Sequence, residues 1–330
     1  MQPNSIWRIK NGRWMSLDRP LIMGVVNCTP DSFYDGGQYD DPQSALSHGL
    51  LLASQGAGIL DVGGESTRPG SRPVGREEEM RRVLPVIRGL HDALAKPGTI
   101  AAPGTGGSAS VGPVSAAGGP VRATSSGSDT HRRPITEAAS VISIDTTKAA
   151  VAAAALEAGA DIVNDVSACR FEPGLLDVLQ HFQPGYVLMH AQGRPETMQI
   201  QPVYDDVVDD VCRFLEDRMD LLVRSGLSET AIVLDPGIGF GKRLEHNLEL
   251  LGNMHRLIRI GRPVLVGLSN KSFWKGLLGL ELGERGTATQ VATALLAVEG
   301  VAIHRVHDVA ATARTLQIVQ AIVGQGRGHC

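Results

Sequence analysis

The stretch VISIDTTKAAVAAAALEAGADIVNDV, residues 141–166, holds two short apolar runs separated by one helix-length segment. The runs VISIDT (141–146) and DIVNDV (161–166) are rich in Ile and Val at consecutive positions, which is typical of parallel strands covered on both faces. Residues 148–158 between them have the composition and period of a helix. A strand, a helix and a second strand in this order predict a parallel sheet.

The same alternation extends to both ends of the chain. Six further β-rich runs are LIMGVVN (21–27), ILDVGG (59–64), YVLMH (186–190), AIVLDP (231–236), PVLVGLS (263–269) and VAIHRVH (301–307). Helix-period segments separate them, among them 76–95, 207–224, 243–258, 287–299 and 308–323. Eight such repeats favour closure into a (β/α)8 TIM barrel, with one domain over residues 1–330, and a doubly wound sheet is the alternative fold.

Two segments fall outside this rhythm. Near the start, IWRIK (6–10) and RWMSL (13–17) flank Asn11-Gly12, a two-residue turn signal that predicts an N-terminal β-hairpin. Residues 97–134 consist mostly of Gly, Ala, Ser, Thr and Pro, with hardly any large apolar side chain. Such a composition buries too little surface to offset its ordering entropy, so we expect a disordered insertion between the second helix and third strand of the barrel.

Composition excludes several functional classes. The formal net charge is −4, and no basic run with interleaved aromatic residues occurs, so nucleic-acid binding is not expected. The four cysteines have no CxxC or zinc-finger spacing and are interpreted as reduced thiols. The N-terminus lacks the apolar region of a signal peptide, and no apolar stretch reaches the roughly 18 residues of a membrane span. We therefore expect a cytoplasmic protein with no membrane partner.

Polar side chains gather where the predicted strands end. In a barrel of this type the active site lies at the carboxyl ends of the strands. Several buried polar groups on one rim would each cost free energy without partners, so a shared polar ligand explains them better than chance. A helix cap is the simpler interpretation for single residues such as Asp145 and Asp308. The candidates at strand ends are Asn27, Glu65, Thr67, Arg68, Asp145, Asn164, Asp235, Ser269, Asn270, Lys271, Arg305 and His307.

The segment DPGIGFGK (235–242) resembles a phosphate-binding loop only superficially. That motif requires GxxxxGK followed by Ser or Thr, but Pro236 stands in the first Gly position and Arg243 follows the lysine. The glycines are better explained by close approach of the backbone to a flat ligand beside Asp235.

Eight segments, taken together and in order, resemble the signature segments of the dihydropteroate synthase family. They are NCTPDSFYDGG (27–37), DVGGESTRPGS (61–71), SIDTTK (143–148), NDVSA (164–168), MHAQGRPETMQ (189–199), DPGIGFGK (235–242), GLSNKSF (267–273) and RVHD (305–308). The resemblance covers residues 21–323 apart from the insertion. It implies a (β/α)8 barrel enzyme of folate biosynthesis that joins 6-hydroxymethyl-7,8-dihydropterin pyrophosphate to p-aminobenzoate, in a family targeted by sulfonamides.

The resemblance assigns pterin binding to Asp145, Asn164, Met189, Asp235 and Lys271. Met189 would contact the face of the ring. The assignment is chemically reasonable, because the aminopyrimidinone edge of a pterin carries adjacent N–H donors, and a carboxylate such as Asp235 accepts two of them at once.

The resemblance also implies two neighbouring subsites. The p-aminobenzoate pocket would comprise Thr67, Pro69, Phe240, Ser269 and Lys271. The pyrophosphate site would comprise Asn27, Arg68, Arg305 and His307, with Asn27 as the protein contact of a Mg2+ ion, which prefers oxygen ligands and keeps several waters. The groups expected to act in catalysis are Asp235, Lys271, Arg305 and His307, and a homodimer is expected from the family alone.

Three residues depart from the family pattern. Asn270 stands where an Arg is usual, Cys28 where a Val is usual, and His304 where an aliphatic residue is usual. Two other functions remain as alternatives, a pterin-binding methyltransferase and a catalytically silent paralogue. The first has no reason to keep the NCTPDSF and STRPG segments, and the second would have lost its anion ligands, so the synthase is preferred.

Overall fold

The computed structural model describes residues 6–29, 42–66, 71, 73–95, 140–194 and 197–326. Its centre is a sheet of eight parallel strands, confirming every predicted run: β3 (Leu21–Asn27), β4 (Ile59–Gly63), β5 (Val141–Asp145), β6 (Ile162–Asp165), β7 (Gly185–Met189), β8 (Ile232–Asp235), β9 (Leu265–Gly267) and β10 (Ile303–Val306). The order is β8-β7-β6-β5-β4-β3-β10-β9.

The two outer strands of this order meet, so the sheet closes into a barrel. Leu234 of β8 forms a parallel bridge with Val264, just before β9, and its N–H donates to the carbonyl of Pro263 at 2.9 Å. Strands that neighbour one another are also consecutive in the chain, apart from the β3–β10 closure. The predicted (β/α)8 barrel is therefore confirmed, and the doubly wound alternative is wrong.

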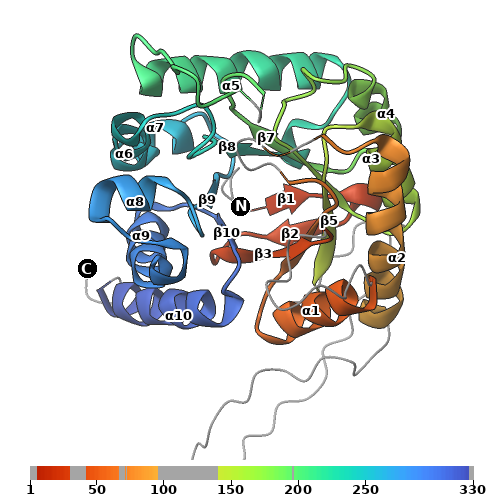
Figure 1. The fold of residues 1–330 in the computed structure, drawn as a ribbon, viewed down its shortest axis with the longest axis horizontal. Coiled ribbons are helices and arrows are strands. Elements are labelled where there is room, and N and C mark those ends of the chain that lie inside the picture. Colours follow the sequence, from red (N-terminus) through yellow and green to blue (C-terminus); the bar gives the residue numbers. More distant parts are fainter. Residues whose placement is uncertain are drawn as a thin grey trace, which may run out of the picture.

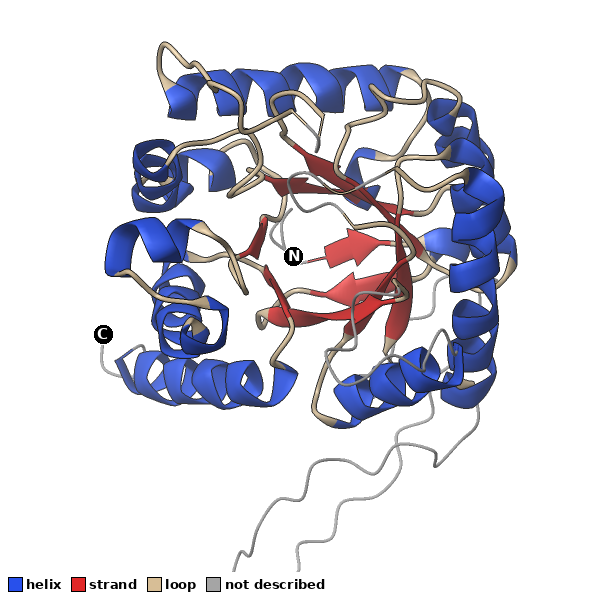
Figure 2. Ribbon diagram, viewed as in Figure 1, coloured by secondary structure: helices blue, strands red, loops and turns tan. Residues whose placement is uncertain are grey.

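Helices form the outer layer around the strands (Figures 1 and 2). They are α1 (Pro42–Ser54), α2 (Arg76–Leu94), α3 (Ala149–Glu157), α4 (Leu175–Phe182), α5 (Val207–Arg224), α6 (Leu244–Gly252), α7 (Met254–Ile258), α8 (Phe273–Leu278), α9 (Gly286–Glu299) and α10 (Val309–Gly326). The single helix predicted over 243–258 is wrong. Asn253 leaves the helical conformation at ψ 27° and separates α6 from α7.

The predicted N-terminal hairpin is present, and it covers the amino-terminal end of the barrel. Strands β1 (Ile6–Arg8) and β2 (Trp14–Ser16) are antiparallel, and the turn between them is the short 3-10 segment Lys10–Gly12 rather than the expected two residues. Trp7 is buried against the first residues of the barrel strands, and its Nε1 donates to the carbonyl of Ala231 at 2.7 Å. The apolar side chains of the hairpin close this end of the barrel, so the opposite end is available for a functional site.

The predicted insertion, 97–134, lies outside the described residues. Its nearest described neighbours are at the amino-terminal end, because α2 ends at Leu94 and β5 begins at Val141. The hydroxyl of Ser140 donates to the carbonyl of Ala57 at 2.7 Å, which fixes the entry to β5 beside the entry to β4. Among the described helices, none is long and apolar enough to span a membrane.

Candidate active site

A pocket with an empty volume of about 350 Å³ opens at the carboxyl ends of the barrel strands. Seven of the residues predicted for the site line it, and they come from six different strands or the loops that follow them. The lining is Asp145, Asn164, Val166, Met189, Asp235, Gly237, Ile238, Phe240, Gly267, Lys271 and Arg305. The barrel thus brings together the polar side chains that the sequence placed at separate strand ends.

Arg305 is held by hydrogen bonds to two buried carboxylates. Its Nε donates to Oδ2 of Asp61 at 2.7 Å, and its Nη2 donates to Oδ2 of Asp145 at 2.8 Å. Burial alone would lower the pKa of Arg305, but the two carboxylates outweigh burial and raise the pKa, so the guanidinium stays charged. The pocket therefore keeps a fixed cation on its floor.

Asp61 is a site residue that the sequence reasoning missed. It lies in β4, is fully buried, and also accepts a hydrogen bond from Nδ2 of Asn164 at 3.0 Å. Because a carboxylate only accepts, the Asn164 amide must turn its NH2 group toward Asp61 and keep its oxygen for a ligand. A charged residue inside an otherwise apolar run was the available signal, since a buried carboxylate requires partners.

Asp235 and Lys271 add an acceptor and a donor on the other side of the pocket. Oδ1 of Asp235 accepts from the N–H of Gly237 at 2.7 Å, which leaves Oδ2 for a ligand. Nζ of Lys271 lies 4.1 Å from the centre of the Phe240 ring, a cation–π arrangement. Val166 and Met189 form a small apolar cluster against which Phe240 packs. The pocket thus has polar groups around its edge and an apolar wall formed by Val166, Met189 and Phe240.

Burial shifts the pKa values of three ionisable groups in the pocket toward neutral pH. It raises the pKa of Asp145 to about 7, because burial and the nearby Asp61 charge outweigh the attraction of Arg305. Burial also raises the pKa of Asp235, against the opposing effects of the Gly237 N–H and Lys271. It lowers the pKa of Lys271 to about 8, although Asp235 opposes this shift. Groups tuned in this way cluster at functional sites.

The loop DPGIGFGK is built around Lys242, whose ammonium is buried inside it. Nζ contacts Nδ1 of His190 at 2.9 Å and donates to the carbonyls of Gly237 at 3.0 Å and Phe240 at 3.1 Å. Burial lowers the pKa of Lys242 to about 7. Both residues were missed, because the lysine was considered only as part of a failed phosphate-loop motif.

The glycines of this loop meet protein rather than a ligand at two positions. Gly237 and Gly241 have positive φ values of 66° and 60°, and a Cβ on either would overlap a carbonyl oxygen, of His190 and Gln192 respectively. Close approach of two loops explains these glycines. The expectation that they admit a flat ligand is corrected to this extent, although Gly237 also lines the pocket.

Of the four residues predicted for the pyrophosphate site, the structure describes Asn27, Arg305 and His307 but not Arg68. Nδ1 of His307 contacts Oγ of Ser269 at 2.9 Å beside the pocket, and Asn27 ends β3 on the same rim. Thr67, Arg68 and Pro69 lie outside the described residues.

The structure confirms one of the two predicted helix caps and contradicts the other. Asp308 caps α10, because its Oδ1 accepts from the N–H of Ala311 at 2.9 Å. For Asp145 the cap is wrong, because its carboxylate binds Arg305 and the first N–H of α3 is bonded instead by Glu172 at 3.1 Å.

Comparison with known proteins agrees with this geometry. The pterin binding enzyme family matches residues 23–100 and 133–307, and the interruption coincides with the predicted insertion. The dihydropteroate synthase of Synechocystis is 36% identical over 305 residues, covering 92% of this chain and 90% of the relative. The chain belongs to the dihydropteroate synthase family.

Solved members of the dihydropteroate synthase family share its fold closely. The Xanthomonas albilineans enzyme with 4-aminobenzoic acid has a TM-score of 0.77 and 38% identity, covering 96% of this chain and 98% of that one. The same enzyme in complex with 7,8-dihydropteroate has a TM-score of 0.74 and 36% identity, with the same coverage. Family membership makes the chain a transferase of folate biosynthesis.

Proposed function

We propose that the pocket binds the pterin of 6-hydroxymethyl-7,8-dihydropterin pyrophosphate and presents its methylene carbon to p-aminobenzoate, giving 7,8-dihydropteroate and pyrophosphate. One observation carries this proposal. The bonds within the site leave oxygens of Asp145, Asn164 and Asp235 as acceptors around one pocket, with Lys271 as the donor. The edge of a dihydropterin offers several N–H donors and a ring carbonyl, which complement that set.

The apolar lining supports a flat ring. Met189 and Val166 cluster together with Phe240 against them, so a planar ligand would pack on these side chains while its edge meets the polar groups. The solved complexes of Xanthomonas albilineans with 4-aminobenzoic acid and with 7,8-dihydropteroate support the two halves of the reaction.

The diphosphate would lie on the rim beside Asn27, Arg68 and His307. Arg305 donates its Nε–H and one N–H of Nη2 to carboxylates, so the two N–H groups of Nη1 and the second N–H of Nη2 are left for the anion. Among the described residues, no three His, Cys, Asp or Glu side chains gather as metal ligands. A Mg2+ ion would fit with the amide oxygen of Asn27 as its protein contact and the remaining oxygens from diphosphate and water. When bound, it would neutralise charge on the leaving pyrophosphate.

The reaction needs little acid–base help from the chain. Aniline nitrogen is unprotonated near neutral pH, so no strong general base is required. We propose that pyrophosphate leaves before the amine attacks. The carboxylates of Asp145 and Asp235 would stabilise the positive charge that develops on the pterin, and Arg305 and Arg68 the leaving anion.

The p-aminobenzoate subsite is proposed at Thr67, Pro69, Phe240, Ser269 and Lys271. Its departure from the family pattern, Asn270, has a backbone reason. Residue 270 has a φ of 62°, a conformation in which Asn is among the better tolerated residues. Its carbonyl accepts from Nη1 of Arg285 at 2.9 Å. The change therefore alters the charge near the subsite without straining the loop.

A homodimer is proposed through α9 and α10. Val291, Leu295 and Val298 share one face of α9 and are more than half exposed, as are Ile318 and Ile322 on α10, which packs against α9. Exposed apolar side chains on two neighbouring helices favour a partner, and a second copy is the simplest one. The cytoplasmic location expected from the sequence stays a prediction.

One assay tests the proposed activity. Release of pyrophosphate from the pterin substrate should depend on p-aminobenzoate and on Mg2+. A pterin-binding methyltransferase would release none, and a silent paralogue would bind pterin without release. Pyrophosphate release that is not accompanied by dihydropteroate formation when p-aminobenzoate is present would contradict the proposal.

A further inference from the structure

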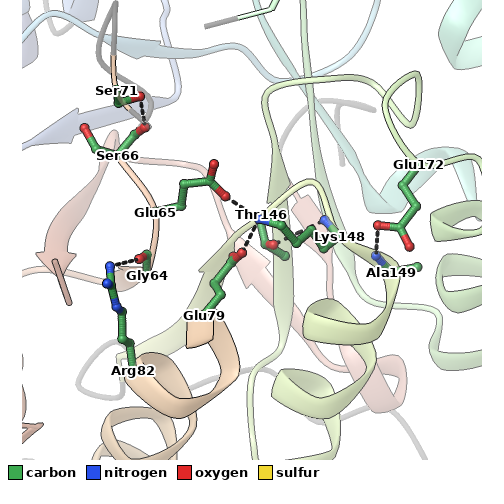
Figure 3. A network of polar contacts seen from close by, with 10 residues as sticks. All are labelled: Gly64, Glu65, Ser66, Ser71, Glu79, Arg82, Thr146, Lys148, Ala149 and Glu172. Atoms are coloured by element: carbon green, nitrogen blue, oxygen red, sulfur yellow. Dashed lines mark hydrogen bonds and ion pairs between the residues drawn. The ribbon is translucent and has the colours of Figure 1, made fainter. Parts of the chain in front are cut away.

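Lys148 joins two carboxylates that come from different parts of the barrel. It lies in the turn between β5 and α3, and Nζ bonds to Oε2 of Glu79 in α2 at 2.5 Å and to Glu65, two residues after β4 (Figure 3). Glu79 is fully buried, whereas Lys148 and Glu65 are partly exposed. One ammonium therefore ties the exits of two neighbouring strands to a helix.

The same chain segment is held to α2 at a second point. Nη1 of Arg82 donates to the carbonyl of Gly64 at 3.0 Å (Figure 3), and a Cβ at Gly64 would lie 2.8 Å from the side chain of Val83 and 2.9 Å from that of Glu79. The chain leaving β4 therefore lies close against α2 at Gly64, and it is bonded at Gly64 to Arg82 and at Glu65 to Lys148. Thr67, Arg68 and Pro69 follow directly in the sequence.

Neutralising the buried Glu79 would need only one ion pair. The second carboxylate, Glu65, is not needed to neutralise Glu79. It belongs to the chain segment that leads to Thr67. Burial alone would lower the pKa of Lys148, but the hydrogen bonds to Glu65 and Glu79 outweigh it and raise the pKa. The ammonium therefore stays charged while it bonds both carboxylates.

We infer that Lys148 is a positioning residue that fixes the chain leaving β4 relative to the turn that carries Asp145. Lys148 follows Asp145, the last residue of β5, by three positions, so the link ties Glu65 to the segment that leaves the pocket residue Asp145. Thr67 and Pro69, which are proposed for p-aminobenzoate, come soon after Glu65 in the sequence. The inference rests on the function proposed for those residues. Lys148 touches neither substrate. Its loss should weaken the second substrate and leave the pterin subsite intact.

The test compares Lys148→Met, Glu65→Gln and Lys148→Arg in the full-length chain. In the first two variants, KM for p-aminobenzoate should rise about fivefold or more. Affinity for a pterin without the diphosphate, measured by calorimetry, should stay within about twofold of the parent. Lys148→Arg retains the charge and should restore most of the KM. Glu65→Gln keeps the Lys148–Glu79 pair, so it decides the matter if Lys148→Met does not fold.

Arg13→Met is the matched control. It breaks a comparable ion pair with the buried Asp161 at the amino-terminal end of the barrel, and should leave both KM values unchanged. A rise in KM for p-aminobenzoate accompanied by an equal loss of pterin affinity would overturn the inference, because it would indicate general loss of structure.

Thr67→Ala separates the inference from the proposed function. If Thr67→Ala raises KM for p-aminobenzoate while folded Lys148→Met and Glu65→Gln match the parent, the positioning role is wrong and the proposed subsite stands. If Thr67→Ala also matches the parent, both are wrong.

Discussion

Nε of Arg305 donates to Oδ2 of Asp61 at 2.7 Å, so the cation on the pocket floor is fixed by a carboxylate that no ligand reaches. The bond links β10 to β4 across β3. Asp61 also orients the amide of Asn164. One buried side chain therefore sets both the direction of a positive charge and the identity of an acceptor in the proposed pterin pocket.

Asp61→Ala should impair both stability and catalysis. Removing one member of a buried ion pair leaves the other charge uncompensated, so the free energy of unfolding should fall by about 3 kcal/mol. kcat/KM for the pterin substrate should fall at least about tenfold, because Arg305 and Asn164 lose their orientation. Urea denaturation and steady-state kinetics measure the two effects. Asp92→Asn, an exposed carboxyl on α2, serves as the control and should change neither.

Lys271 and Asp235 are expected to contribute directly to the reaction. Lys271→Ala and Asp235→Ala should each lose at least about 2 kcal/mol of transition-state stabilisation, because each variant either leaves a buried charge unpaired or loses a charged hydrogen bond. That loss corresponds to roughly 30-fold in kcat/KM. Near-parental activity in either folded variant would show that the pterin subsite is wrongly assigned.

The sequence predicted the eight strands because parallel strands covered on both faces are continuously apolar, a signal that survives without any tertiary information. It also predicted the seven pocket residues, through the resemblance and their place at strand ends. The break at Asn253 was not predictable, because the apolar period continues across it and only the local conformation changes.

The sequence also could not predict which side chains pair with one another across the barrel. Asp61 and Arg305 are 244 residues apart, and Lys242 and His190 are 52 apart. Asp145 and Arg305 are likewise 160 residues apart. Nothing local to any of these residues indicates its partner, so a helix cap was as reasonable for Asp145 as an ion pair with Arg305.

The activity should have a narrow pH optimum. Asp145 has a pKa of about 7, so it is protonated below that pH and becomes a poorer acceptor. Lys271 has a pKa of about 8, so above that pH it loses the charge that it donates from. kcat/KM for the pterin substrate should therefore fall on both sides of pH 7 to 8.

Two variants assign the limbs of this profile. Asp145→Asn should remove the acid limb, and Lys271→Arg should move the basic limb upward, while the ionisation of the substrate affects all three proteins equally. A parental profile that is flat from about pH 6 to 9 would contradict the assignment of both groups.

Substrate binding should be ordered. Thr67, Arg68 and Pro69 are consecutive and are proposed to serve both the diphosphate and p-aminobenzoate. If diphosphate and Mg2+ organise this segment, p-aminobenzoate should bind measurably only in their presence, and linkage makes the coupling reciprocal. Calorimetric titration of p-aminobenzoate with and without pyrophosphate and Mg2+ measures it. Equal affinity in the two titrations would show that the subsites are independent.

Replacing residues 99–132 by a short linker should leave the activity intact. The segment connects the end of α2 to the start of β5, and both described flanks lie at the amino-terminal end of the barrel. The pocket lies at the opposite end. Turnover should therefore stay within about twofold of the parent, a change of less than about 1 kcal/mol in the barrier.

The stability of the shortened protein follows from loop closure. Its entropic cost grows only logarithmically with length, so the free energy of unfolding should change by about 1 to 2 kcal/mol at most, and in the favourable direction. Chemical denaturation of parent and variant measures this. The family match breaks off between residues 100 and 133, so the shortened chain would retain every segment that carries the resemblance. A folded variant with roughly a hundredfold less activity, about 2.7 kcal/mol in the barrier, would mean that the segment reaches the site or a subunit interface.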